Sequence, residues 1–309
     1  MSEWVSKLGT FLEKFIIMKM DMGFVYKTQT ETLHEFDKFC NNKFPEADII
    51  TQDMVLEWLN NSNRKSGTVN ARFSALRQFA LYIQLSRPDS FVPSTSLRVR
   101  REQFICHIMT DKEATRLFDA LDHMTNVGTY VHRAQTYQAF FRLLYCAGLR
   151  PSEAHKLNRE NINWASNTIT ILASKGHAKR VVPLSGDMAH WLKSYDQSLP
   201  SERTPFFSFD GMHRPSIKAF SLCLRTTWKA ANPESTGVRL HDFRHTFITK
   251  RILEWHKNHA DLKRKLPLLM SFVGHKRVED TLYYFRVIPE LCGLLDSVVR
   301  VDVIPEEGD

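Results

Sequence analysis

The sequence lacks both the cysteine spacing of a metal site and the long apolar run of a membrane protein. Its five cysteines are scattered, with no C-x-x-C pair and no metal-ligand spacing: Cys40, Cys106, Cys146, Cys223 and Cys292. Scattered thiols are typical of a reducing compartment, where they act mainly as small core residues. The apolar run near the N-terminus, residues 15–18, is short and has charge on both sides. We therefore expect a cytoplasmic protein with no signal peptide and no membrane span.

The composition is that of a globular protein with an excess of positive charge. Of the 309 residues, 43% are hydrophobic and 25% are charged, which argues against a disordered chain and is enough for two domains with buried cores. The formal net charge is +8 and the isoelectric point is about 9.2. This balance favours a polyanionic partner, but many proteins share it, so the motifs have to decide.

The first 90 residues show the apolar periodicity of a compact helical domain. Four apolar stripes at helical spacing begin at Trp4, Leu33, Met54 and Val69. Basic residues surround the last stripe, as a solvated face or as contacts to a polyanion: Arg64, Lys65, Arg72 and Arg77. Two prolines and several serines then break the periodicity. We predict a basic linker over residues 91–107, which carries Arg98, Arg100 and Arg101.

Residues 108–309 are predicted to form a second domain, mainly α-helical with a small antiparallel β-sheet. Thr110 and Glu113 fit a capping box at the start of a helix. Gly148 is placed to end one helix and Pro151 to open the next. In NTITILASKGHAKRVVPL, apolar residues on both sides of a Lys-Gly turn predict a β-hairpin with Lys175 at or near its tip.

The segment LHDFRHTFITK, residues 240–250, places His241, Arg244 and His245 on one predicted helix. Histidines four residues apart can hold a metal, but the fixed charge of the arginine between them would repel a cation. Arginine and imidazole donors instead suit a dense anion such as a phosphate. Arg150 falls at a predicted helix start, where free backbone N–H groups also favour an anion.

Six chemistry-bearing residues follow one another in a fixed order: Arg150, Lys175, His241, Arg244, His275 and Tyr284. With this series the chain resembles the tyrosine recombinase (phage integrase) family, and the resemblance covers nearly its whole length. SGTVNARFSALRQF is similar to the last helix of that family's core-binding domain. Phe243 replaces the commoner leucine, and the stretch from Arg244 to His275 is longer than in compact members. LPLLMSFVGH is similar to integrases of transposon-like elements.

The resemblance implies a two-domain DNA clamp, with a SAM-like helical core-binding domain in residues 1–90 and a catalytic domain in residues 108–309. It implies the following roles: Arg150 and Arg244 brace the non-bridging oxygens of a DNA phosphate, Lys175 protonates the leaving 5′-oxygen, His241 is a base or proton relay, His275 donates to the phosphate, and Tyr284 attacks to give a 3′-phosphotyrosine. No metal or other cofactor is needed, because one phosphoester replaces another. His245 lies outside this set and is expected to pack beneath the site.

The resemblance also implies partners. The expected partners are double-stranded DNA, three further copies of the chain in a homotetramer on two DNA sites, and accessory proteins encoded by the same element. The expected location is the cytoplasm of a prokaryote, with the protein associated with the nucleoid when it is bound to DNA. An apolar stripe in the C-terminal tail is expected to dock into a neighbouring protomer: Leu291, Leu294, Leu295 and Val298. The expected reaction is integration or excision of a mobile genetic element. Two alternatives remain open: a type IB topoisomerase, and a catalytically inert DNA-binding regulator.

Overall fold

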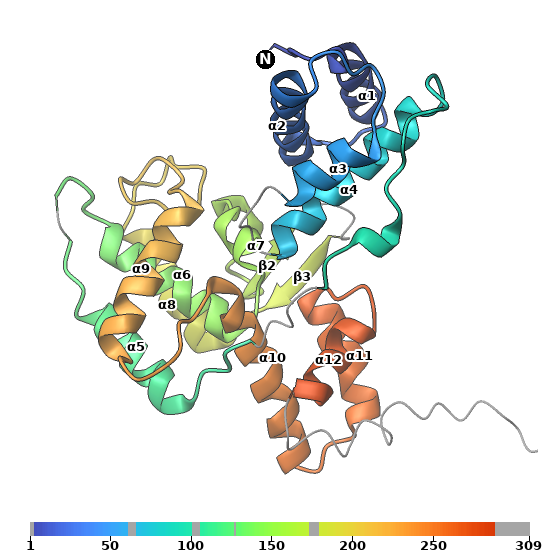
Figure 1. Ribbon diagram of the computed structural model, residues 1–309. Helices are drawn as coiled ribbons and strands as arrows, with labels where there is room; N and C mark the ends of the chain where they lie inside the picture. Colours follow the sequence, from blue (N-terminus) through green and yellow to red (C-terminus); the bar gives the residue numbers. More distant parts are fainter. Residues whose placement is uncertain (1–2, 61–65, 101–105, 127, 173–178, 288–309) are drawn as a thin grey trace, which may run out of the picture. The chain divides into compact units, whose positions relative to one another are not determined.

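The computed structural model describes residues 3–60, 66–100, 106–126, 128–172 and 179–287. The chain divides into two compact units, residues 1–104 and 105–309, and each is described by itself (Figure 1). Within the described ranges, no helix is long and apolar enough to cross a membrane.

The first unit is a helical bundle in which every predicted apolar stripe forms a helix. Its elements are α1 (Gly9–Asp21), α2 (Lys27–Lys43), α3 (Gln52–Asn60), α4 (Ser66–Ile83) and the short 3₁₀ helix η1 (Thr95–Leu97). Helix α4 contacts each of the other three α-helices. Aromatic side chains from several helices meet in its core, among them Phe15, Phe36, Trp58, Phe73 and Phe79. The periodicity in the sequence is thus the pattern of burial.

The chain that follows α4 is tied back onto this helix. The side-chain amide of Asn70 donates to the carbonyl of Val99 (2.7 Å), and the Val99 N–H donates to the Asn70 carbonyl oxygen (3.0 Å). Arg77 donates to the carbonyl of Pro93 (2.6 Å). Residues 91–100, the first part of the predicted linker, therefore have a defined path along the first unit.

The second unit is mainly helical, as predicted. Its helices are α5 (Asp111–Asp122), α6 (Arg133–Ala147), α7 (Pro151–His155), η2 (Arg159–Asn161), α8 (Gly186–Gln197), α9 (Ile217–Ala231), α10 (Leu240–Lys257), α11 (Leu262–Val273) and α12 (Glu279–Val287). The capping box of Thr110 and Glu113 is confirmed at the start of α5. Helix α6 carries Phe140 and Phe141 through the main core. Helices α10, α11 and α12 surround a smaller core (Figure 1).

The predicted antiparallel sheet is also confirmed, in the order β1 (Ile162–Asn163), β2 (Thr168–Ile171) and β3 (Arg180–Pro183). In the β2–β3 hairpin Ile169 pairs with Val182, and both side chains are buried. The register pairs Ile171 with Arg180, so Arg180 begins β3 at the end nearest the connection. Lys175 belongs to residues 173–178, which lie outside the described residues.

Gly148 ends α6 in the left-handed conformation, with φ of +56°. A Cβ atom here would lie 2.4 Å from the ring of Phe247 on α10, far inside van der Waals contact. The glycine therefore allows both the sharp exit from α6 and the close approach of α10.

We expect Gly148→Ala to lower the free energy of unfolding by about 2–4 kcal/mol, because it combines left-handed strain with a steric overlap in a packed region. Thermal or urea unfolding of the full chain measures this. Gly186→Ala is the matched control, because Gly186 lies in the first turn of α8 with no atom within 4 Å of an added Cβ. Equal stability of the two variants would contradict the conclusion that the left-handed turn and the approach of α10 require a glycine at position 148.

Candidate active site

Two of the predicted arginines are fixed to the same helix end. Arg244, buried in the first turns of α10, donates to the carbonyls of Gly148 (3.0 Å) and Val273 (2.6 Å). Arg150, immediately before α7, donates to the carbonyl of Gly274 (2.8 Å). Val273 and Gly274 form the C-terminal end of α11. Residues far apart in the sequence thus bring their guanidinium groups to one point.

A buried carboxylate lies beside this pair. Glu153 accepts hydrogen bonds from the Arg150 N–H and guanidinium (both 2.9 Å) and from both terminal nitrogens of Arg180 (2.9 and 2.7 Å). Burial alone would raise the pKa of Glu153, but the hydrogen bonds from Arg180 and the Arg150 backbone, together with the positive charges, hold it at about 2. Glu153 is therefore ionised.

The local charge remains positive. Burial and the neighbouring charge of Arg150 lower the pKa of Arg244 to about 9, which still leaves the guanidinium protonated at neutral pH. Glu153 forms ion pairs with Arg150 and Arg180, and its charge also acts on Arg244. Arg244 has five N–H donors and uses two of them on described residues. The site can therefore take up an anion with donors in place.

His275 follows this helix end directly. Gly274 takes the left-handed conformation, with φ of +70°, and His275 donates its backbone N–H to the Met270 carbonyl (2.9 Å). Its Nδ1 lies 2.7 Å from the Thr281 hydroxyl, so Nε2 is the other ring nitrogen available for a ligand. Burial and the charges of Arg244 and Arg150 lower the pKa of His275 to about 3, so the imidazole is neutral at neutral pH.

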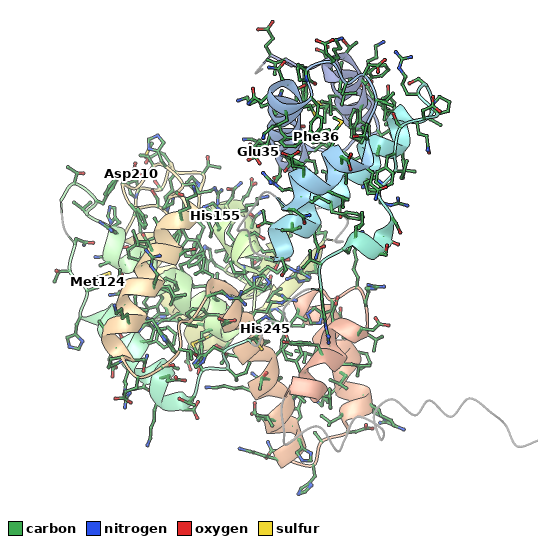
Figure 2. The ribbon with its side chains drawn as sticks, viewed as in Figure 1. Glu35, Phe36, Met124, His155, Asp210 and His245 are labelled. Carbon is green, nitrogen blue, oxygen red and sulfur yellow. The ribbon has the colours of Figure 1, made fainter. Side chains whose placement is uncertain are left out.

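Tyr284 lies on α12 with its hydroxyl 2.9 Å from Nδ1 of His245. Its side chain is only 2% exposed, and burial raises its pKa well above the usual value although Arg244 pulls it down. Burial and the neighbouring His241 lower the pKa of His245 to about 4. A neutral imidazole therefore faces a protonated phenol. The sequence predicted a packing role for His245, and spacing along the chain gave no sign of this contact (His245 is labelled in Figure 2).

His241 and Tyr283 have different surroundings. His241 is exposed one turn before His245, and the ring centroids are 5.9 Å apart. Partial desolvation and the charges of Arg244 and Arg150 lower its pKa. The Tyr283 hydroxyl donates to the sulfur of Cys106 (3.8 Å), and burial raises its pKa to about 12. The two adjacent tyrosines thus have different partners, as expected for neighbouring positions on a helix.

The basic residues predicted in the first unit are not equivalent. Arg72 is buried, forms an ion pair with Glu35 and lies over the Trp58 ring (4.8 Å), so its charge is already engaged in packing (Glu35 is labelled in Figure 2). Arg77 is partly buried. Arg98 and Arg100 are exposed. The DNA contact of Arg72 stays a prediction; the structure places this side chain inside the first unit, and periodicity alone does not show which arginine turns inward.

Several predicted residues lie outside the described ranges. These are Lys175, Arg64, Lys65 and Arg101, and the tail positions Leu291, Leu294, Leu295 and Val298.

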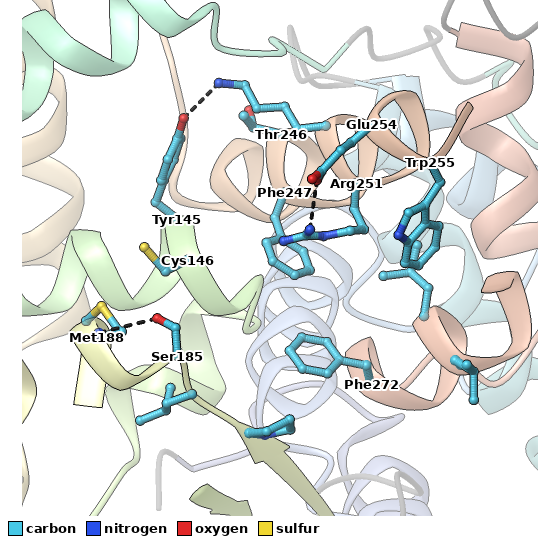
Figure 3. A pocket seen from close by; sticks show the side chains of 15 residues that line it. Tyr145, Cys146, Ser185, Met188, Thr246, Phe247, Arg251, Glu254, Trp255 and Phe272 are labelled. Atoms are coloured by element: carbon cyan, nitrogen blue, oxygen red, sulfur yellow. Dashed lines mark hydrogen bonds and ion pairs between the residues drawn. The ribbon is translucent and has the colours of Figure 1, made fainter. Parts of the chain in front are cut away.

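Further along α10, the second unit has a groove of about 680 Å³ that the sequence did not indicate. Its walls come from the end of α6, the β3–α8 turn, α10 and α11 (Figure 3). Phe247 and Phe272 stack with ring centroids 5.6 Å apart, and Trp255 lies on the α10 side. Leu268 is 65% exposed in the same lining. The lining also contains Lys250, Arg251 and Glu254, so the groove combines an apolar surface with charged side chains, which suits a protein segment.

The neutral histidines give a pH dependence of stability. The folded pKa values of His245 and His275, about 4 and about 3, lie below the ordinary 6.5, so the unfolded chain binds more protons in between. The contribution of these histidines to the free energy of unfolding should be fully present above pH 6.5. It should decrease as the pH drops toward 4, by on the order of 1–3 kcal/mol for each histidine. When unfolding is measured across this pH range, His245→Gln and His275→Gln should each lose less unfolding free energy than the wild type. The exposed control His190→Gln should match the wild type; an equal loss in all variants would contradict the burial argument.

The sequence pattern of the phage integrase family matches residues 107–290. The integrase/recombinase y4rB of Sinorhizobium fredii is 27% identical over 294 residues, which cover 91% of this chain and 93% of the relative. The tyrosine recombinase XerD of Lacticaseibacillus casei is 28% identical over 234 residues, 72% of this chain and 73% of the relative.

Solved structures show the same fold. A lambda integrase dimer bound to a COC′ core site superposes with a TM-score of 0.68 at 15% identity, covering 89% of this chain and 94% of that one. The XerH recombinase in a post-cleavage complex with palindromic difH gives a TM-score of 0.65 at 17% identity, covering 88% and 78%. With the family pattern matched over more than half of its length, the chain belongs to the phage integrase family of tyrosine recombinases.

Proposed function

We propose that this tyrosine recombinase cuts and rejoins double-stranded DNA through a covalent 3′-phosphotyrosine, in the integration or excision of a mobile genetic element. The observation that carries the proposal is the hydrogen bond between the Tyr284 hydroxyl and the neutral imidazole of His245. It lies close to a cluster of arginines that are fixed at one helix end. The mobile-element role rests on the similarity to a relative named integrase/recombinase along most of the chain.

The arginines supply the binding and the charge stabilisation. Arg150 and Arg244 donate to the two non-bridging oxygens of the scissile phosphate, and their preset positions stabilise the extra negative charge of the pentacoordinate transition state. His275 adds a donor from Nε2, since Thr281 occupies its Nδ1 side. Little reorganisation is needed, because backbone carbonyls already hold both guanidinium groups.

The proton of the nucleophile needs an acceptor, because the raised pKa of Tyr284 keeps its phenol protonated. His245 has the geometry for this step, with Nδ1 at 2.9 Å and a neutral ring. We assign it the first proton transfer, with the exposed His241 as relay to solvent. The Tyr284 oxygen then bonds to phosphorus while the bond to the 5′-oxygen breaks, and Lys175 protonates the 5′-oxygen. The number of phosphoester bonds is unchanged, so no metal or nucleotide cofactor is required.

The alternatives differ in what they predict. A type IB topoisomerase would relax plasmids without site preference, whereas a DNA-binding regulator would form no covalent adduct. The contact between Tyr284 and His245 argues against the regulator, because DNA binding alone does not require a buried tyrosine that is hydrogen-bonded to an imidazole.

The partners we propose are double-stranded DNA, contacted by exposed residues such as Arg98 and Arg100, and three further copies of the chain in a tetramer on two sites. Accessory proteins encoded by the same mobile element determine whether recombination runs toward integration or excision. We propose that the groove beside α10 receives the C-terminal tail of a neighbouring copy, because the tail has an apolar stripe in its sequence and the groove is lined by partly buried aromatic side chains and the exposed Leu268. A head-to-tail contact of this kind forms a closed ring when four such contacts complete a full rotation, as the proposed tetramer requires.

Exchange of each tyrosine for phenylalanine tests the chemistry. On nicked suicide duplexes, Tyr284→Phe should bind DNA normally and give no covalent adduct on a denaturing gel, because it has lost the nucleophile. Tyr283→Phe is the matched control and should still form adducts, because its hydroxyl points to Cys106. The reverse result would move the nucleophile by one residue. Adducts from both variants would remove the proposed mechanism.

Substitution of an exposed groove residue tests the tetramer. Leu268→Glu should leave binding to a single DNA site within about twofold but reduce two-site complexes and recombination by at least about tenfold, because a charge in an apolar contact is costly. Truncation after residue 287 should have the same effect. Leu222→Glu on α9, where the leucine is 50% exposed and outside the groove, is the control. Normal recombination by Leu268→Glu would rule out the groove as the docking site.

A further inference from the structure

Three arginines hold three successive carbonyl groups at the C-terminal end of α11. The pairs are Phe272 with Arg180 Nε (2.9 Å), Val273 with Arg244 (2.6 Å) and Gly274 with Arg150 (2.8 Å). The last carbonyls of a helix have no partner within the helix and lie at the negative end of its dipole. The guanidinium groups therefore both satisfy this helix end and are held in place by it.

Arg180 differs from the other two because all three of its guanidinium nitrogens donate to protein atoms, and two of them form an ion pair with a buried carboxylate. Its Nε donates to Phe272, and its two terminal nitrogens form a fork with the two oxygens of Glu153. The side chain is 10% exposed. It has little capacity left for a phosphate, so its effect on the site has to pass through its neighbours.

Those neighbours are residues of the proposed site. Glu153 also holds the backbone N–H and the guanidinium of Arg150. On the other side, a Cβ added to Gly274 would lie 3.0 Å from the Arg180 guanidinium, so this group rests against the backbone of the residue that precedes His275. Arg180 also begins β3, immediately after the connection to which Lys175 belongs.

We propose that Arg180 is a positioning residue for the reaction: it neutralises Glu153 and clamps the end of α11. Arg150 then stays available for the scissile phosphate, and the neutral His275 keeps its place beside it. This rests on the function proposed above. Without Arg180, the carboxylate of Glu153 would keep Arg150 as its ion-pair partner, and this ion pair would compete with the phosphate. The helix end would also lose the donor to Phe272.

The test uses full-length protein and nicked suicide duplexes that carry the DNA site recovered from covalent adducts of the wild type in its host. The rate of adduct formation at saturating DNA is measured separately from DNA affinity. Arg180→Gln should slow adduct formation by roughly 10–100-fold, the usual effect of removing a group that orients a site residue, and change affinity less than about threefold. A wild-type rate would overturn the proposal.

A charge-balanced double variant separates positioning from general stability. If Glu153 competes for Arg150 once Arg180 is gone, then Arg180→Gln/Glu153→Gln should form adducts at least about threefold faster than Arg180→Gln. A merely structural role predicts a slower double variant, because a further buried hydrogen-bond network is lost. A double variant that is no faster would overturn the electrostatic part of the proposal.

Two further variants keep the outcome decisive. Arg180→Lys retains the charge but not the planar fork, so it should fold and show an intermediate loss; a wild-type rate for it would overturn the clamp on α11. Arg159→Gln removes an equivalent fork, from Arg159 to Asp196, away from the site, and should cleave within about twofold of the wild type. If the wild type itself forms no adduct through Tyr284, the proposed function fails; if it does and the Arg180 variants equal it, only this inference fails.

Discussion

The second unit depends on the burial of positive charge. A buried guanidinium is stable only when its donors have partners, and here the partners are backbone carbonyls and one carboxylate. Arg244 is held by Gly148 and Val273, and this fixes the end of α6 and the end of α11 relative to α10. The same contacts that make the burial of charge tolerable therefore define where an anion can bind. In this part of the molecule, the contacts that stabilise the fold are therefore the same contacts that arrange the site.

The electrostatic consequence is a division of roles among the polar residues. Burial, together with the neighbouring positive charge, lowers the pKa of His245 and His275 and keeps both imidazoles neutral, while the hydrogen bonds and charge of the arginines keep Glu153 ionised. A neutral imidazole can accept a proton from Tyr284 and can donate one to an oxygen, which a charged ring next to arginines would do less well. Burial and the arginines together thus set the protonation state of the residues that would move protons.

Much of the fold could be read from the sequence because burial follows helical and strand periodicity. The stripes in residues 1–90, the capping box at Thr110 and the hairpin before Val182 correspond to observed elements. The basic residues were harder to interpret, because an arginine near an apolar stripe can turn outward, or can turn inward onto an aromatic ring, as Arg72 does on Trp58. Which of these occurs depends on a partner such as Glu35 in another helix.

The sequence by itself determined the family, the order of the site residues and the helical character of both units, since these depend on local spacing and residue type. Only the tertiary structure decided which residues meet. The approach of His245 to Tyr284 and of Arg180 to the end of α11 joins residues 39 and 92 positions apart. No local pattern encodes such contacts, because they result from how α10, α11, α12 and β3 pack around a shared core and a shared charge.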